Sequence, residues 1–172
     1  MAVAIIALLA TIATPSIKSF IPKDERKILL ENLNSITATG LSNAILTGKI
    51  NRVVFDLKNN KIYIQEQTGN KLATGALEYA DISSKYASSE ISLDTTLFDL
   101  KNFYIDSKDE MGTPSDEGVK ERLWFYILPE GTCQVVILNF IDNTVTGEED
   151  QFSFLVNPFT CQFKYYEKFM AP

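Results

Sequence analysis

The chain has 172 residues, of which 45% are hydrophobic and 22% are charged, so it is long enough for one domain with a sizeable core plus one long element, and its composition excludes a disordered chain. The 16 basic residues are scattered and the net charge is −6, which argues against nucleic-acid binding, because a polyanion needs clustered Lys and Arg. The absence of histidine removes the commonest general base, the commonest catalytic metal ligand and every nucleophile activated by His, so we do not expect an enzyme.

The first element in the chain is an uncharged apolar run from Ala2 to Ala13, and the first charged residue is Lys18. As a helix, the residues before Lys18 span roughly 25 Å, whereas a bilayer core is about 30 Å thick. Three interpretations are open. The first is a secretory signal peptide, which should begin with Lys or Arg, whereas no basic residue precedes Lys18. The second is a buried core helix, which would be apolar on all its sides. The third interpretation is a membrane helix whose beginning is missing from this sequence.

A second helix is predicted over residues 23–47. Pro22 followed by Lys23, Asp24 and Glu25 is typical of a helix start, with proline in the first turn and acids near the positive end of the dipole. Gly48 is a natural stop. Apolar residues then recur at near-helical spacing and predict an amphipathic helix that packs one stripe against a sheet: Leu30, Leu33, Ile36, Leu41, Ala44 and Ile45.

The remainder of the chain is rich in predicted strands. The segment Lys58-Asn59-Asn60 separates the first two and indicates a hairpin. Strands this close in sequence favour an antiparallel meander over parallel units with helical crossovers. The predicted strands are 52–57, 61–66, 98–105, 121–128, 133–141, 151–156 and 162–167.

The run Met1–Pro15 (MAVAIIALLATIATP) resembles the hydrophobic N-terminal segment of type IV pilins and type II secretion pseudopilins. The pattern around Pro129-Glu130-Gly131 and the stretch Lys49–Gln65 resemble the minor pseudopilin H type. The resemblance implies an α+β fold, with a long N-terminal helix packed on an antiparallel β domain. Its membrane part would be residues 1–21 and its extracytoplasmic domain residues 22–172, with the sheet over 52–167.

In this family a basic leader ending in glycine is removed by a prepilin peptidase, and a glutamate near the mature N-terminus supports assembly. Neither the leader nor the glutamate is present in this sequence, so we expect Met1 to be an internal methionine of a longer natural chain. The resemblance implies that the apolar segment packs against the same segment of neighbouring subunits. The implied membrane and assembly residues are Val3, Ile5, Ile6, Leu8, Leu9, Ile12 and Pro15.

The function implied is that of a structural subunit, a minor pilin or pseudopilin, of a type II secretion pseudopilus or a type IV pilus. Its expected partners are other pilin or pseudopilin subunits, the inner membrane and the assembly machinery. Its expected location is the inner membrane, crossed once, with the C-terminal domain in the periplasm or outside the cell. The alternative is a secreted or periplasmic β-rich binding module with a cleaved signal peptide.

Two cysteines, Cys133 and Cys161, lie in the last third of the chain. They are either buried free thiols or a disulfide, and the export-like N-terminus favours a disulfide, because it implies an oxidising compartment. Such a bond would close a loop of about 29 residues and contribute roughly 3–4 kcal/mol. The two can meet only if their strands are neighbours or next neighbours.

Acidic residues cluster in two predicted loops, the first with Asp106, Asp109, Glu110, Asp116 and Glu117, the second with Glu148, Glu149 and Asp150. Calcium takes six to eight oxygen ligands from flexible loops, but the spacing matches no EF-hand. We therefore expect solvated loops, no bound metal and no cofactor, with calcium in the first loop as the alternative.

Overall fold

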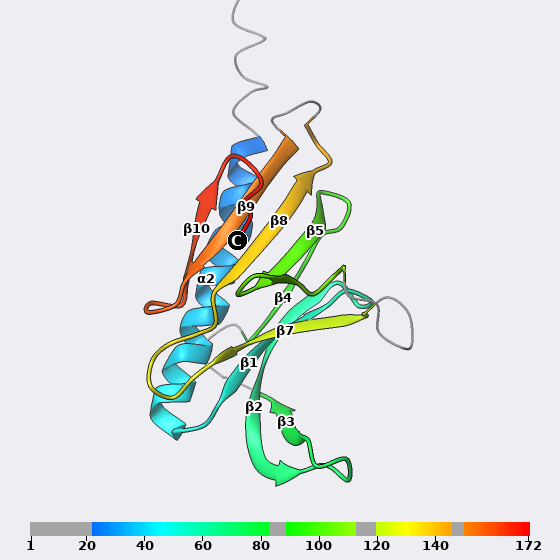
Figure 1. Cartoon of the computed structure of the whole chain (residues 1–172). Helices are drawn as coiled ribbons and strands as arrows, with labels where there is room; N and C mark the ends of the chain where they lie inside the picture. Colours follow the sequence, from blue (N-terminus) through cyan, green and yellow to red (C-terminus); the bar gives the residue numbers. More distant parts are fainter. Residues whose placement is uncertain (1–21, 83–88, 113–119, 146–149) are drawn as a thin grey trace, which may run out of the picture.

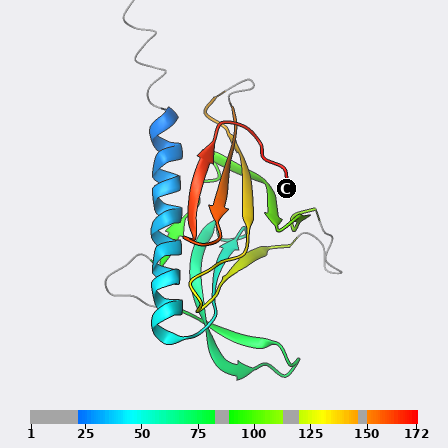
Figure 2. The same cartoon turned by 60° about the vertical axis from the view of Figure 1, so that its left-hand side comes forward.

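The computed structural model describes residues 22–82, 89–112, 120–145 and 150–172. One long helix, α2 (Pro22–Thr47), lies along two five-stranded antiparallel sheets, as Figures 1 and 2 show from two sides. This is the α+β architecture that the sequence predicts, with an N-terminal helix packed on antiparallel strands. The predicted membrane part, residues 1–21, lies outside the described residues. Within the described ranges, no helix is both long enough and apolar enough to cross a membrane.

Helix α2 starts one residue before the predicted range and ends where it was expected to end. Gly48 has a φ of 67° and donates its N–H to the carbonyl of Ala44 at 2.9 Å, which closes the last turn. The buried stripe consists of Leu29, Leu33, Ile36, Thr37, Gly40 and Ala44.

The predicted stripe of α2 was therefore correct in part. Leu30 and Leu41 are half-buried at its margins, and Ile45 is wrong, because 55% of its side chain is exposed. A glycine occupies the centre of the stripe. A Cβ built on Gly40 would lie 2.9 Å from Cδ1 of Ile127, so the absence of a side chain lets the helix backbone approach the sheet closely.

The first sheet has the strand order β3-β2-β1-β7, with β4 also paired to β2. The predicted hairpin turn is present between β1 and β2, where an oxygen of the Asp56 carboxylate accepts the N–H of Asn59 at 2.9 Å and Asn60 has a φ of 53°. The strands are β1 (Asn51–Asp56), β2 (Lys61–Lys71), β3 (Leu77–Asp81), β4 (Glu90–Ser92) and β7 (Arg122–Ile127).

The second sheet has the strand order β10-β9-β8-β5-β6. Its strands are β5 (Phe98–Ile105), β6 (Lys108–Asp109), β8 (Val136–Asp142), β9 (Gln151–Asn157) and β10 (Gln162–Tyr166). The chain therefore departs from a simple meander, because β7 returns to the first sheet and pairs with β1 although it lies between β6 and β8 in sequence.

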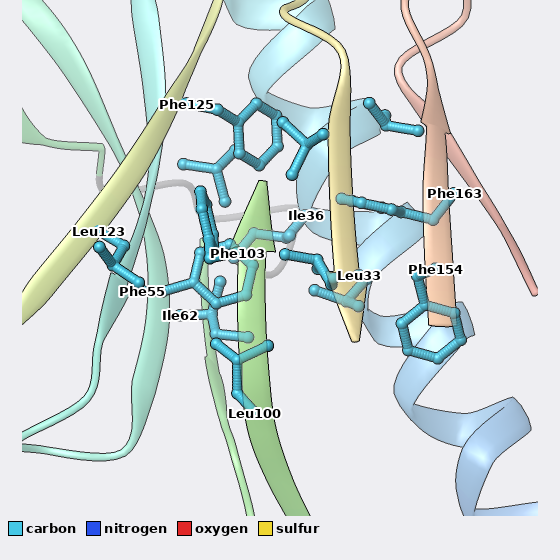
Figure 3. Packing of buried hydrophobic residues seen from close by; sticks show 14 of the residues in the cluster. Leu33, Ile36, Phe55, Ile62, Leu100, Phe103, Leu123, Phe125, Phe154 and Phe163 are labelled. Atoms are coloured by element: carbon cyan, nitrogen blue, oxygen red, sulfur yellow. The ribbon is translucent and has the colours of Figure 1, made fainter. Parts of the chain in front are cut away.

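One continuous core joins the two sheets and the helix. Phe55 of β1 and Phe103 of β5 meet edge to face, with ring centroids 5.1 Å apart, and thereby connect the first sheet to the second. Figure 3 shows these rings beside Leu33 and Ile36 of α2. Aromatic rings of β8, β9 and β10 extend the core along the second sheet, with Phe140 and Phe152 stacked at 5.4 Å.

Candidate functional site

The residues predicted to carry assembly, Val3 to Pro15, lie outside the described residues. The structure describes the helix α2, which follows them in the sequence.

An ion pair holds the first turns of α2 to the second sheet. The Nε atom of Arg26 donates to an oxygen of Asp142 at 2.7 Å, and its Nη1 atom donates to the hydroxyl of Tyr165 at 3.1 Å. The Arg26 guanidinium also lies over the ring of Phe152, 4.9 Å from its centroid. Asp142 is only 1% exposed, and burial raises its pKa, but the hydrogen bonds from Thr144 and Arg26 outweigh burial and hold the pKa below its usual value.

Further along, side-chain amides join α2 to strands of both sheets. Asn34 donates to the carbonyl of Phe163 at 3.2 Å and accepts the N–H of the same residue at 2.6 Å, so it pairs with the open edge of β10 as a neighbouring strand would. Asn51 donates to the carbonyl of Gly40 at 2.8 Å in the buried centre of the interface. The helix is thus attached at several points along its length.

The opposite face of α2 is exposed and has small side chains. Ser35, Ala38 and Ser42 follow one another at intervals of three and four residues and therefore lie on one face. With Leu46 and Ile82 they line a shallow hollow of about 440 Å³. Small side chains allow a second helix to come close to this face.

The two cysteines are close together, but the structure does not contain the predicted disulfide, since both are buried free thiols. Cys133 lies just before β8, and Cys161 lies in the turn between β9 and β10 with a φ of 53°. A hydrogen bond between the two thiols, together with burial, raises the pKa of Cys133. The strands next to the two cysteines are neighbours or next neighbours, as a disulfide would require, because β8, β9 and β10 are consecutive in the second sheet.

The acidic residues of the first predicted loop are used by local structure where the structure describes them. Asp109 accepts hydrogen bonds from the backbone N–H of Phe103 at 3.2 Å and of Met111 at 3.0 Å, and Glu110 forms ion pairs with Lys120 and Lys108. Asp106 stands in the turn between β5 and β6. Across the described ranges, no three acidic or cysteine side chains form a group that could hold a metal ion.

Four of the other predicted acids, Asp116, Glu117, Glu148 and Glu149, lie outside the described residues. Asp150 is half-buried immediately before β9.

A cleft lies beside β7, the end strand of the first sheet. It has a volume of about 210 Å³ and is lined by Ile105 of β5 on one side and by Leu123 and Trp124 of β7 on the other. Lys120 and Glu110 form an ion pair at its rim. Sequence reasoning missed this cleft, because it depends on the return of β7 to the first sheet, for which the strand pattern has no local signal.

No known sequence family and no curated protein matches this chain in sequence. Solved structures do match in fold. Two structures of the minor pseudopilin EpsH from the type II secretion system of Vibrio cholerae are similar to it. In one, 14% of residues are identical, the TM-score is 0.54, and the match covers 87% of this chain and 98% of that one. In the other, 15% of residues are identical, the TM-score is 0.52, and the match covers 81% of this chain and 94% of that one. The chain has a pseudopilin-like fold, as the resemblance in its sequence implied.

Proposed function

We propose that this chain is a structural subunit, a minor pilin or pseudopilin, of a type II secretion pseudopilus or a type IV pilus. The observation that carries the proposal is the similarity of nearly the whole fold to a minor pseudopilin at a TM-score of 0.54. A role in assembly, rather than in catalysis, agrees with the absence of histidine from the sequence.

The proposed assembly element is the segment from Val3 to Pro15, which precedes α2. In lipid, a helix satisfies its own backbone groups, and an apolar surface has no exposed polar groups to desolvate. When such helices leave the bilayer, they stay favourable only if neighbouring helices cover the same apolar surface. On the outer face of α2, the small side chains of Ser35, Ala38 and Ser42 would let a neighbouring helix approach outside the membrane as well.

The proposal places the chain in the inner membrane, with the β domain on the far side from the cytoplasm and with other pilin-like subunits as its partners. In such an oxidising compartment we propose that Cys133 and Cys161 join, because the backbone N–H of Cys133 donates to the carbonyl of Pro158 in the turn that contains Cys161. Mass spectrometry of the exported chain without reductant should then show the loss of two hydrogens. Two alkylatable thiols after denaturation would contradict this part.

Membrane attachment is tested with the full chain produced in a bacterium that has an inner and an outer membrane. We expect it to stay in the membrane pellet after a carbonate wash, and we expect Leu8→Asp and Leu9→Asp together to release it, because a charge at the centre of a membrane helix costs about 3 kcal/mol. The matched control is Leu46→Asp, which replaces a side chain that is 84% exposed on α2 and should leave the fractionation unchanged. A soluble parent chain would contradict the proposal.

Assembly is tested by cross-linking between cysteines introduced on the outer face of α2. Ala38→Cys, in a background with both native cysteines replaced by serine, should give covalent oligomers in membranes, because neighbouring helices meet on this face. Thr95→Cys, which is exposed in the segment between β4 and β5, is the control and should remain monomeric. Equal yields from the two variants would show random collision rather than assembly.

A further inference from the structure

The outer face of the first sheet has a row of polar and aromatic side chains that crosses four of its five strands, β3, β2, β1 and β7. Strand pairing places Arg52 of β1 opposite Tyr126 of β7 on one side and opposite Gln65 of β2 on the other. Gln65 is in turn opposite Asp81 of β3. This face is turned away from the core, to which the alternate residues of β1, Val53 and Phe55, belong.

Arg52 is held in this row by uncharged side chains. Its guanidinium lies 4.1 Å from the ring centroid of Tyr79 and 5.1 Å from that of Trp124, and its Nε atom donates to the side-chain oxygen of Gln65 at 2.8 Å. Among the described residues, no carboxylate forms an ion pair with it. Two aromatic rings and a glutamine thus order the side chain, and its terminal N–H donors remain available as a planar fork.

The aromatic side chains around Arg52 are ordered as well. The indole N–H of Trp124 donates to the hydroxyl of Tyr126 at 3.1 Å, and the rings of Tyr126 and Tyr79 are 6.2 Å apart. Trp124 is 39% exposed, while Val54, the residue opposite it on β1, is almost completely buried. We call Arg52, Tyr79, Trp124 and Tyr126 the aromatic platform. It lies on β1, β3 and β7, whose arrangement Figure 1 shows.

The surroundings of Arg52 argue against two classes of ligand. β1 is paired on both sides, with β2 and with β7, so an extended peptide lying across it would find no free backbone groups to pair with. A nucleic acid would need several cations, whereas the other cations of this face are neutralised, Arg122 by Asp56 at 2.9 Å and Lys61 by Glu90 at 2.7 Å.

A carboxylated sugar fits the side chains that the platform offers. The negative face of an aromatic ring attracts the C–H groups on the flat side of a pyranose, and Trp124 can offer such a ring face. The fork of Arg52 suits a carboxylate, with which it can form two parallel hydrogen bonds. Gln65 and Asp81, joined by a hydrogen bond of 2.8 Å at the end of the row, supply polar groups for sugar hydroxyls. The open face suits a chain of sugars rather than a single one.

We propose that the aromatic platform binds a carboxylated polysaccharide, with a uronate carboxylate on Arg52 and a sugar ring on Trp124. The inference does not depend on assembly and holds for the chain as a subunit or as a separate protein. It is directly testable, because Trp124 is the only tryptophan in the sequence and its fluorescence therefore reports from the platform itself.

The experiment is a fluorescence titration of the full chain in detergent with oligogalacturonate. We expect a saturable change in Trp124 emission, and at least a tenfold weaker apparent affinity in Arg52→Gln. Arg52→Lys, which keeps the charge but loses the planar fork, should bind almost as weakly as Arg52→Gln. The matched control is Arg122→Gln, which removes a neutralised cation from the same sheet face and should bind as the parent chain does.

Three comparison ligands decide between the proposal and its rivals. Neutral dextran should give no saturable change, and poly-L-glutamate and inorganic polyphosphate should bind at least tenfold more weakly than oligogalacturonate. If either polyanion bound as tightly as oligogalacturonate, the specificity for a sugar would be wrong. If dextran bound as tightly, the role of the carboxylate would be wrong. No response to oligogalacturonate, or an unchanged response in Arg52→Gln with native circular dichroism, would overturn the proposal altogether.

Discussion

At the scale of single residues, the contact between Arg26 and Asp142 is the most buried ion pair in the described structure. Asp142 is 1% exposed and Arg26 is 11% exposed, so neither charge is well hydrated if the other is removed. We expect Asp142→Asn to lower the free energy of unfolding by about 2–3 kcal/mol, somewhat less than a fully buried pair, because Arg26 keeps some solvent. Urea denaturation of the purified chain measures this.

The control for that variant is Lys58→Ala. Lys58 pairs with Glu121 at 2.8 Å, but both side chains are more than 60% exposed, so the loss should stay below about 1 kcal/mol. Equal losses from the two variants would contradict the argument from burial.

The same carboxylate predicts how stability depends on pH. The pKa of Asp142 is held below its usual value in the folded chain, and so is that of Asp56, where hydrogen bonds from Asn59 and Arg122 outweigh burial. Each group therefore stabilises the fold above the pKa of the unfolded chain, near 4, and this contribution is lost as the pH falls through the lower folded value. We expect the free energy of unfolding to decline below about pH 4. The decline should be shallower in Asp142→Asn, and an equal slope in both would contradict the assignment.

At the scale of elements, Gly40 determines how closely α2 can approach the first sheet. A Cβ at this position would already lie 2.9 Å from Ile127 and 3.7 Å from Ile64, both of which are buried. We expect Gly40→Leu to destabilise the chain by about 3 kcal/mol, or to prevent folding, because overpacking forces the helix away from the sheet. A thermal melt by circular dichroism measures the change.

Ser42→Leu is the matched control for Gly40→Leu. It lies on the exposed face of the same helix and should change the free energy of unfolding by no more than about 0.5 kcal/mol. A larger loss from Ser42→Leu than from Gly40→Leu would mean that the outer face of the helix, rather than its inner face, is packed.

Elements with a strong local pattern could be predicted, and those that depend on distant partners could not. The helix, the hairpin turn after Asp56 and the strand Phe98–Ile105 agree closely with expectation, because proline, Asx turns and segments rich in aromatic residues act locally. The strands β3 and β4 were missed, because they are short, polar and held mainly by pairing with β2. The stripe of α2 was misplaced towards Ile45, because Gly40 has no hydrophobic signal although it lies at the centre of the contact.

The candidate sites also divide into one that could be predicted from the sequence and one that could not. The closeness of Cys133 and Cys161 follows from the order of the last strands and could be expected, whereas the aromatic platform could not. Arg52, Tyr79 and Trp124 are far apart in sequence and come together only because β7 joins β1 across the first sheet. No pattern within one strand indicates such a return.

At the scale of the whole molecule, the core that joins both sheets predicts a single cooperative unfolding transition. Phe55 and Phe103 pack across the two sheets, and α2 contacts strands of both. We expect urea titrations followed by Trp124 fluorescence, which reports on the first sheet, and by far-ultraviolet circular dichroism, which reports on the whole chain, to have the same midpoint. Midpoints separated by more than their errors would show that the sheets unfold independently.

The attachment of α2 along both sheets has a mechanical consequence. A force applied at Pro22 along the helix axis would load the contacts of Arg26, Asn34 and Gly40 in shear and at the same time, because they follow one another along the helix and each joins it to a strand. Peeling them apart one after another would require a sideways pull at one end. A tether that enters the domain through this helix can therefore be drawn lengthwise with little risk of stripping the helix from the domain.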